Sequence, residues 1–179
     1  MKDELTLEER IDLHRRMAES YHSAYDAKAV KEGATYDEWK FAKDAVYYSP
    51  YFGQGLIYLN AHPISVSTSA TMEAKAYSLT FPDWGPEEFK CWPSDNGFVM
   101  QTLFSGHAKD GKKMSFYSYG FVETNGQGEI TRWETHVNRD YDDFLDMAIG
   151  IHGPFDNGGS AYMEALGRTL KAAGVELKI

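Results

Sequence analysis

The sequence has a single cysteine, Cys91, among its 179 residues. One thiol can form neither an internal disulfide nor a metal site built from several cysteines. The neighbouring residues, Lys90 and Trp92, form no motif that would activate a thiolate. We therefore interpret Cys91 as a structural residue.

Basic charge is also scarce. The chain carries 18 Lys and Arg residues against 27 Asp and Glu residues, which gives a net charge of −9 at pH 7. Such a charge repels nucleic acids and anionic membranes, and no cluster of basic residues offsets it. We expect neither a nucleic-acid partner nor a membrane partner.

Long hydrophobic runs are missing, and the first residues, MKDELTLEER, are charged from the second position. We therefore expect a cytoplasmic protein. The nucleotide motifs, the metalloprotease HExxH motif and the G-x-S-x-G serine motif are also missing. We expect no cofactor and no metal, because a metal site would have to be assembled in space from His107, His136 and carboxylates.

Aromatic residues, in contrast, are abundant: 12 Tyr, 10 Phe and 4 Trp. In a small domain, so many large rings wall a cavity or an interface, or they fill a core. The composition does not distinguish these alternatives.

Helices are expected at both ends of the chain. Thr6 and Glu9 form a capping box before an apolar stripe that should run to about Lys28. Thr35 and Glu38 suggest a second short helix over 35–44, and further helices are expected over 67–81, 141–150 and 160–174.

Strands are expected over 45–53 and 56–60, and then over 88–94, 97–109, 112–124 and 129–138. The turn sequences DG (110–111) and NGQG (125–128) join the last three strands into an antiparallel meander. This order predicts an α+β fold, with helices packed on a curved antiparallel sheet that encloses a conical pocket. We expect a single domain over 1–179, with a core cone over 1–140 and a helical extension over 141–179. The 151–159 linker is either a lid over the pocket or a spacer.

The stretch from 104 to 133 resembles the nuclear transport factor 2-like superfamily, and within it the SnoaL-like polyketide cyclases and scytalone dehydratases. The matching features are GH at 106–107, DGK at 110–112, Phe121 and GEI at 128–130. The resemblance implies a cone-shaped barrel in a homodimer or homotrimer. The superfamily includes dehydratases, isomerases, cyclases, hydrolases and binding modules, so the fold does not choose a function.

The similarity to scytalone dehydratases implies roles for individual residues. Tyr25 and Asp26 stand where that family has a tyrosine followed by an acid, Tyr48 or Tyr47 matches a tyrosine of the first strand, and His107 matches a histidine of the meander. These groups would hold and activate a water molecule without a metal. The family's second histidine has no counterpart in this sequence.

The stretch ITRWETHV (130–137) places Arg132, Glu134 and His136 on one face of a strand and Trp133 on the other. If the polar row lines the cone, Glu134 could orient His136, and Arg132 could hold an oxyanion. If it faces outward, it is a solvated or subunit-contact surface. We place it in the cavity, because the cone needs polar groups.

The neighbouring strand has a row of large rings that includes Tyr117 and Tyr119, which would suit either an aromatic substrate or a subunit interface. We assign Tyr117, Tyr119, Phe104, Trp92 and Arg132 to substrate binding. The assigned catalytic residues are His107, Asp26, Tyr25, Tyr48, Glu134 and His136.

The function that these residues predict is a cofactor-free lyase, dehydratase or isomerase that acts on a hydroxylated aromatic molecule by acid–base catalysis. Tyrosines and Arg132 would stabilise a phenolate or quinone-methide-like intermediate. The chain also looks similar in kind to enzymes that remove formaldehyde from lignin-derived diarylpropane diols to give stilbenes. The alternatives are a polyketide-type ring closure and a small-molecule binding module without catalysis.

Overall fold

The computed structural model describes residues 4–25, 38–53, 57–61, 64–155 and 159–175. Helices in this part of the chain are α1 (Leu7–Tyr25), α3 (Val66–Thr80), α4 (Asp140–Ile149) and α5 (Ser160–Ala172), with a 3-10 turn η1 (Leu59–Ala61). The strands are β1 (Phe41–Tyr48), β2 (Ile57–Tyr58), β3 (Gly85–Ser94), β4 (Gly97–His107), β5 (Lys113–Thr124) and β6 (Ile130–Val137).

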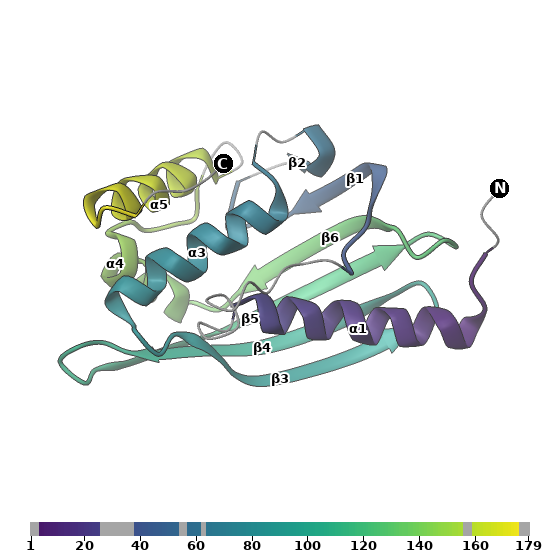
Figure 1. The fold of residues 1–179 in the computed structure, drawn as a ribbon, viewed down its shortest axis with the longest axis horizontal. Coiled ribbons are helices and arrows are strands. Elements are labelled where there is room, and N and C mark those ends of the chain that lie inside the picture. The colour runs from purple at the N-terminus through teal and green to yellow at the C-terminus, as the bar shows by residue number, and fades with distance from the viewer. Residues whose placement is uncertain (1–3, 26–37, 54–56, 62–63, 156–158, 176–179) are drawn as a thin grey trace.

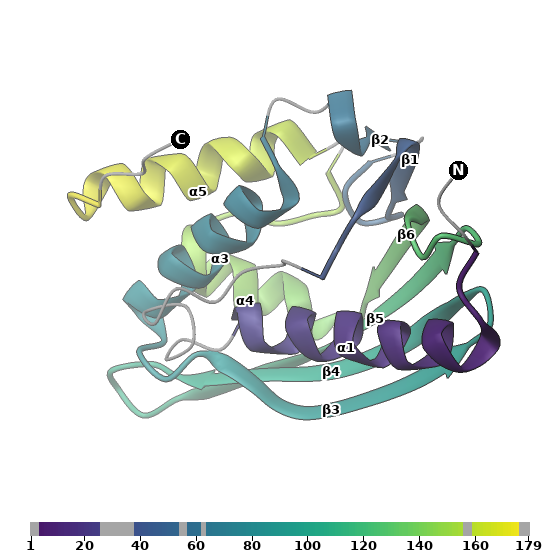
Figure 2. The ribbon, with the colours of Figure 1, turned by 45° about the vertical axis from the view of Figure 1, so that its right-hand side comes forward.

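The strands form one sheet in the order β2-β1-β6-β5-β4-β3. It is curved, and its two edge strands, β2 and β3, do not meet. The helices lie within the curve of the sheet (Figures 1 and 2). The expected α+β class, with helices on one face of a curved sheet, is therefore confirmed.

Helix α1 begins as the sequence predicts. The Thr6 backbone N–H donates to the Glu9 carboxylate at 2.8 Å, and the Glu9 N–H donates back to the Thr6 hydroxyl at 3.3 Å. This capping box satisfies two backbone donors that the first turn cannot pair internally. The helix is described as far as Tyr25, so its expected end near Lys28 lies outside the described residues.

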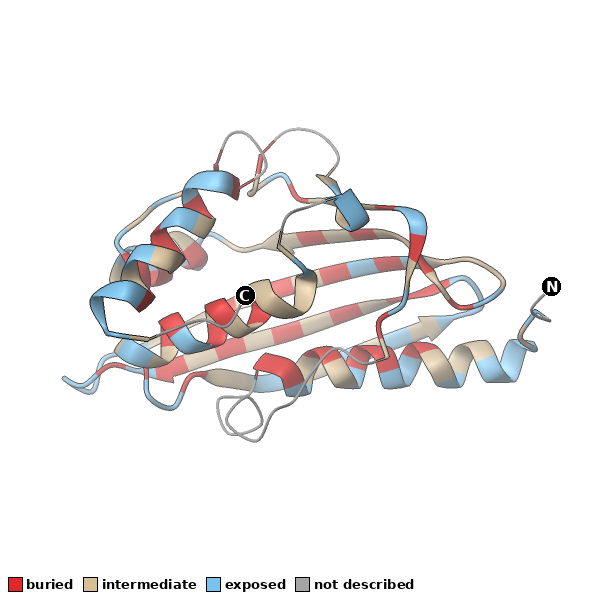
Figure 3. Cartoon of the chain, turned by 45° about the horizontal axis from the view of Figure 1, so that its top comes forward, coloured by how far each residue is buried: buried red, intermediate tan, exposed pale blue. Residues whose placement is uncertain are grey.

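The meander from β3 to β6 is antiparallel throughout, as predicted. Buried and less buried residues alternate along its strands (Figure 3). One set of side chains faces the helices, and the other set forms the outer face of the sheet, which no described helix covers.

Two expectations for the first strand are wrong. Residues 41–44, placed in a helix by the sequence, are the start of β1, and β1 pairs with β6 in parallel. Lys43 and Asp44 are weak strand formers, but the residues on either side of them, Phe41 and Val46, pair with β6, and this pairing overrides the local preference. Residues 38–40 of the expected helix form a turn and irregular backbone, and residues 35–37 lie outside the described residues.

The segment that follows the meander completes the wall on the helical side. Helix α4 packs on β5, and α5 packs on α3. Phe155, from the expected lid or spacer, is buried against the rings of Tyr51 and Phe52. No helix among the described residues is long and apolar enough to cross a membrane.

Candidate functional site: a tyrosine-lined pocket around Glu73

A pocket of about 150 Å³ lies between the inner face of the sheet and the helices. Helices α1, α3, α4 and α5 and the middle strands all contribute to its lining. The lining residues are Tyr21, Tyr25, Tyr47, Phe52, Ile57, Leu59, Ile64, Val66, Ser69, Glu73, Tyr77, Trp84, Phe104, Phe116, Ser118, Trp133, Thr135, Val137, Tyr141, Gly159, Tyr162 and Met163. An apolar cavity of this volume can hold a single benzene ring.

Aromatic rings form most of the wall. Trp84 stacks on Phe104 with ring centroids 5.2 Å apart and on Phe116 at 5.6 Å. On the opposite side, Trp133 meets the ring of Tyr47 edge-on at 4.9 Å. Such walls favour a flat apolar or aromatic ligand.

Glu73 is the one carboxylate among the described residues of this lining. It lies on the face of α3 that also carries the buried Ala70, Ala74 and Tyr77. The surrounding protein half-buries Glu73, and the side chain lines the pocket. The Tyr162 hydroxyl donates to its Oε1 at 2.8 Å, and the Tyr25 hydroxyl also hydrogen-bonds to it.

Burial and hydrogen bonding shift the pKa of Glu73 in opposite directions. Burial raises the pKa of the carboxyl above its ordinary value of 4.5, whereas the hydrogen bonds from Tyr25 and Tyr162 lower it again. A carboxyl with a raised pKa is a stronger base than an ordinary glutamate, and it can take a proton and return it, as an acid–base catalyst must.

Three tyrosine hydroxyls meet beside Glu73. Tyr77 hydrogen-bonds to Tyr141 at 3.1 Å and more closely to Tyr162, and the Tyr141 and Tyr162 oxygens are 3.4 Å apart. Burial raises the pKa of each phenol well above 10. All three therefore remain neutral and can act only as hydrogen-bonding groups.

A second group of hydroxyls lies on the sheet side of the pocket. The Tyr47 hydroxyl bonds to the Thr135 hydroxyl, and Ser49 also hydrogen-bonds to Tyr47. Tyr21 hydrogen-bonds to Ser118. The described lining holds no Lys, Arg or His, so Glu73 has no cationic partner there.

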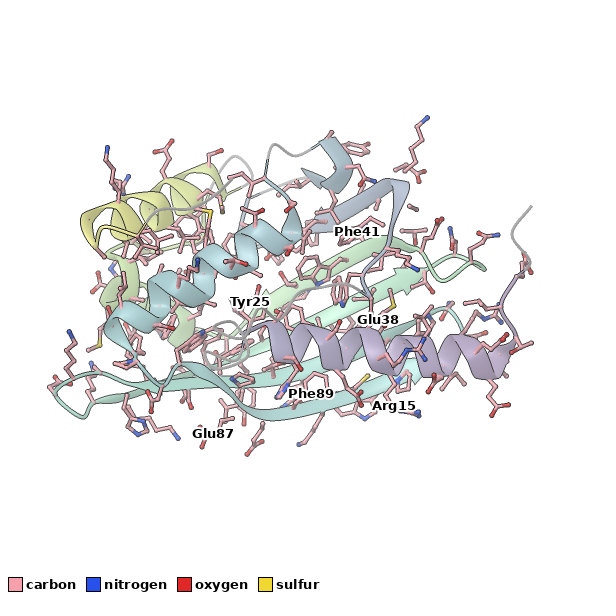
Figure 4. All side chains as sticks on the ribbon, viewed as in Figure 1. Arg15, Tyr25, Glu38, Phe41, Glu87 and Phe89 are labelled. Atoms are coloured by element: carbon pink, nitrogen blue, oxygen red, sulfur yellow. The ribbon has the colours of Figure 1, made fainter. Side chains whose placement is uncertain are left out.

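Two of the residues that the sequence assigns to the site line the pocket: Tyr25, at the end of α1 that faces α3 (Figure 4), and Phe104 on β4. Asp26 lies outside the described residues. The other eight residues do not line the pocket: His107, Tyr48, Glu134, His136, Arg132, Tyr117, Tyr119 and Trp92.

The placement of Arg132, Glu134 and His136 in the cavity is wrong. The Glu134 carboxylate binds Arg132 at 3.0 Å and His136 at 2.7 Å on the outer face, while Trp133 and Thr135 line the pocket. A strand that packs one face on helices turns its more apolar side inward, and here Trp133 determines which side that is.

A bulge in β6 changes the face on which Ile130 lies relative to Arg132, Glu134 and His136. Thr124 pairs with Ile130 and Glu123 pairs with Arg132, so Thr131 is an extra residue in β6. The bulge breaks the strict alternation and turns Ile130 to the same side as Trp133, where both are buried. Ile130 therefore does not share the polar face, contrary to the period-two interpretation.

The tyrosine row of β5 also faces outward. Tyr117 and Tyr119 stack at 6.1 Å on the outer face, and the alternate residues Phe116 and Ser118 line the pocket. Trp92 is 52% exposed. On β1, Tyr48 lies on the outer face under Arg132, 5.6 Å from its guanidinium carbon, whereas its neighbour Tyr47 enters the pocket.

His107 is a surface residue at the end of β4. Its Nδ1 lies 2.8 Å from the Asp83 carboxylate, and its backbone N–H donates to the same side chain at 2.6 Å. Both side chains are more than half exposed, at 52% and 56%. The position assigned to His107 in the pocket is therefore wrong, because the strand has already left the cavity at this point.

Metal ligands are not grouped in the described part of the chain. No three His, Cys, Asp or Glu side chains there lie close enough to hold an ion. In particular, His107 and His136 are bound to carboxylates at separate places, the end of β4 and the outer face of β6.

Sequence reasoning missed Glu73 and the tyrosines of the three later helices. A signal was present, because Glu73 falls in the helical stripe of Ala70, Ala74 and Tyr77, where an apolar residue would be expected. Tyr141 and Tyr162 had no such signal, since only the packing of α4 and α5 brings them to α3.

No family model and no curated protein matches the sequence. Among solved structures, the chain is similar to an NTF2-like protein of unknown function from Cytophaga hutchinsonii, with a TM-score of 0.47, 11% identity, and coverage of 72% of this chain and 99% of that one. The chain is also similar to a protein from Jannaschia sp. CCS1 that is provisionally described as a SnoaL-like polyketide cyclase. Here the TM-score is 0.46 and the identity 8%, and the match covers 83% of this chain and 96% of that one. For a steroid delta-isomerase from Pseudomonas aeruginosa, the TM-score is 0.44 and the identity 15%, and the match covers 94% of this chain and 97% of that one.

These descriptions name the superfamily and the cyclase branch that the sequence resembles. The TM-scores lie below 0.5 and the identities below 25%, so the activities of these proteins do not transfer to this chain. What the chain does must follow from the pocket itself.

Proposed function

We propose that the pocket catalyses proton transfer on a small hydroxylated aromatic molecule, with Glu73 as the group that takes and returns the proton. The observation that carries this proposal is a carboxylate in an aromatic pocket, held by the hydroxyls of Tyr25 and Tyr162. Raised basicity, fixed orientation and contact with the cavity are what a general base requires.

The charge of the lining favours an uncharged substrate. An anionic substrate would meet the Glu73 carboxylate and no Lys, Arg or His in the described lining. It would also approach a chain of net charge −9. A neutral phenol or alcohol, in contrast, can stack on the rings and share hydrogen bonds with the neutral tyrosines.

The reaction class is that of a lyase, dehydratase or isomerase. Glu73 takes a proton from a hydroxyl or an acidic C–H of the substrate, the bond to the leaving group breaks, and protonated Glu73 returns the proton to the product or to the leaving oxygen. A quinone methide formed from a conjugated phenol would accept the electrons within the substrate itself.

A narrower proposal is the conversion of a diarylpropane-1,3-diol to a stilbene, water and formaldehyde. The phenol assists loss of the benzylic hydroxyl as water and becomes a quinone methide. Glu73 then takes the proton of the terminal hydroxyl, and the C–C bond breaks to release formaldehyde. The electron pair of that bond forms the stilbene double bond and restores the aromatic ring as a phenolate, which regains a proton as Glu73 releases the one that it took. The pocket supports the base and the binding of one ring, and the second ring would occupy its mouth.

Substitution of Glu73 tests the proposal. Turnover is measured on a panel of neutral phenols and benzylic alcohols that includes a diarylpropane diol, with formaldehyde and stilbene as products. Glu73→Gln should lower kcat by about 10²- to 10⁴-fold and change substrate affinity only a few-fold. Glu87→Gln, which alters an exposed carboxylate paired with Lys113 on the outside of β3 (Figure 4), should leave both unchanged.

Two results would contradict the proposal. Full turnover by the Glu73→Gln variant would exclude this carboxylate as the base. Tight binding of panel members with no turnover by either protein would favour the alternative, a binding module without catalysis.

A further inference from the structure

The hydroxyls on the sheet side of the pocket are separate from the Glu73 cluster. The Tyr47 hydroxyl on β1 hydrogen-bonds to the Thr135 hydroxyl on β6, and the Ser49 side chain also hydrogen-bonds to Tyr47. Thr135 and Ser49 are buried, at 7% and 3% exposure. The row therefore runs from the protein interior to the cavity, where Tyr47 and Thr135 are lining residues.

This row has hydrogen-bonding capacity left over. Each hydroxyl offers one donor and two acceptor positions, so Ser49, Tyr47 and Thr135 together offer three donors and six acceptor positions. The two bonds within the row, and one from the Tyr51 backbone N–H to Ser49 at 3.3 Å, use only part of these. Polar capacity that is buried and unused costs free energy, which a ligand hydroxyl would recover.

The wall beside the row holds another unused group. The indole N–H of Trp133, whose ring meets the Tyr47 ring at 4.9 Å, is buried and has no hydrogen-bond partner among the described residues. In contrast, the indole N–H of Trp39 donates to the Met17 carbonyl at 2.7 Å. This buried donor lies beside the row, whose hydroxyls reach the cavity at Tyr47 and Thr135.

We propose that Tyr47 and Thr135 form a second anchoring point, which holds the phenol hydroxyl of a substrate whose other oxygen function lies at Glu73. This inference rests on the proposed function and specifies its substrate class: an aromatic ring with a phenol at one end and an aliphatic hydroxyl or carbonyl at the other. Tyr47 and Thr135 are specificity-determining residues, and Glu73 performs the proton transfer.

The chemistry of the anchor fits a phenol. Burial raises the pKa of Tyr47, so its side chain stays neutral and exchanges hydrogen bonds with a phenol without competing for its proton. A substrate ring that is held at this end by its hydroxyl and packed against Trp133 would direct its other substituent toward the helical side of the pocket, where Glu73 lies. Hydrogen bonds to a site built for a hydroxyl discriminate strongly against analogues that lack it.

Binding of inert probes tests the anchor without any turnover. The affinities of 4-ethylphenol and ethylbenzene are measured by calorimetry for the wild-type protein and for Tyr47→Phe and Thr135→Val. Each substitution should lower the ratio of phenol affinity to hydrocarbon affinity by about five- to tenfold, the effect of one hydrogen bond. Thr135→Ser, which keeps the hydroxyl, should retain the ratio. Thermal unfolding shows whether each variant is folded.

Tyr48→Phe is the matched control, because Tyr48 is the next residue of the same strand and lies on the outer face. It should leave the ratio unchanged. The inference is overturned if Tyr47→Phe and Thr135→Val keep the wild-type ratio, or if the ratio falls only in Tyr162→Phe, which would place the phenol at the Glu73 end. These ratios measure binding and not turnover. The anchor can therefore be disproved while Glu73→Gln still lowers turnover, and the two proposals are tested separately.

Discussion

The Tyr162 hydroxyl donates a 2.8 Å hydrogen bond to Glu73 and thereby joins the last described helix to the carboxylate of α3. This bond lowers the pKa of Glu73 against the upward effect of burial. The residue that tunes the base therefore belongs to a helix that the sequence suggested was only an extension of the cone.

Removal of that bond should shift the pH dependence of catalysis. In Tyr162→Phe the ionised carboxylate loses a donor, so the pKa of Glu73 rises further. Since the base must be ionised, the acid limb of the kcat/KM profile should move to higher pH. Tyr58→Phe, at a tyrosine that is 58% exposed, is the control. A shift to lower pH in Tyr162→Phe would contradict the assigned direction.

The polar groups of the outer face should be dispensable for turnover. His107→Asn and Glu134→Gln alter side chains that lie outside the pocket, bonded to Asp83 and to Arg132 and His136. We expect kcat/KM to stay within about twofold of wild type, because neither group touches the cavity. A loss of a hundredfold in either variant would move the reaction to the outer face.

The stability of the fold should depend on His14. It is fully buried, with Nδ1 2.7 Å from the Ser94 carbonyl oxygen and Nε2 2.8 Å from the Thr124 hydroxyl. The carbonyl can only accept, so Nδ1 donates and Nε2 accepts from Thr124. Burial lowers the pKa of His14 below its ordinary 6.5.

A lowered histidine pKa has a defined sign for stability. The unfolded chain takes up the proton first as pH falls below 6.5, so the free energy of unfolding decreases from that pH downward, by at most about 1.4 kcal/mol per pH unit for one proton. Urea unfolding at about pH 7.5 and 5.5 should show a larger loss for wild type than for His14→Gln. The control is His152→Gln, at a side chain that is 60% exposed. Equal losses in wild type and His14→Gln would contradict the assignment.

The expected homodimer or homotrimer remains a prediction. The outer face carries Trp92 and Phe121, which are 52% and 44% exposed, and no described helix covers them. Exposed apolar patches of this kind often mark contact surfaces. Sedimentation equilibrium should give two or three chains per particle, and Phe121→Glu should give a monomer. A monomeric wild-type protein at high concentration would contradict the expectation.

The sequence predicted the parts of the fold that depend on local pattern. The capping box of Thr6 and Glu9, the turns between β4, β5 and β6, and the helix beginning at Val66 are each determined by nearby residues. It failed at β1, where Lys43 and Asp44 favour no strand, and where pairing of the flanking Phe41 and Val46 with β6, far along the chain, makes one.

The site was harder to predict, because it depends on which face each strand turns inward. Period-two alternation placed Ile130 with Glu134, and the bulge at Thr131 cannot be read from composition. On β1 the sequence left open whether Tyr48 or Tyr47 faces the pocket, and in the structure Tyr47 does so, packed against Trp133. The prediction favoured a histidine and an arginine in one row, although the half-buried carboxylate of Glu73 was the better candidate.

The pH profile of kcat/KM for wild type and Glu73→Gln tests the central claim most directly. If Glu73 is the base, the wild-type rate should rise with pH through an acid limb whose midpoint lies above 4.5, the ordinary pKa of a glutamate, because burial raises it. The Glu73→Gln variant should be slower at every pH and should lack that limb. The same limb, at the same midpoint and with undiminished rate in Glu73→Gln, would show that another group transfers the proton.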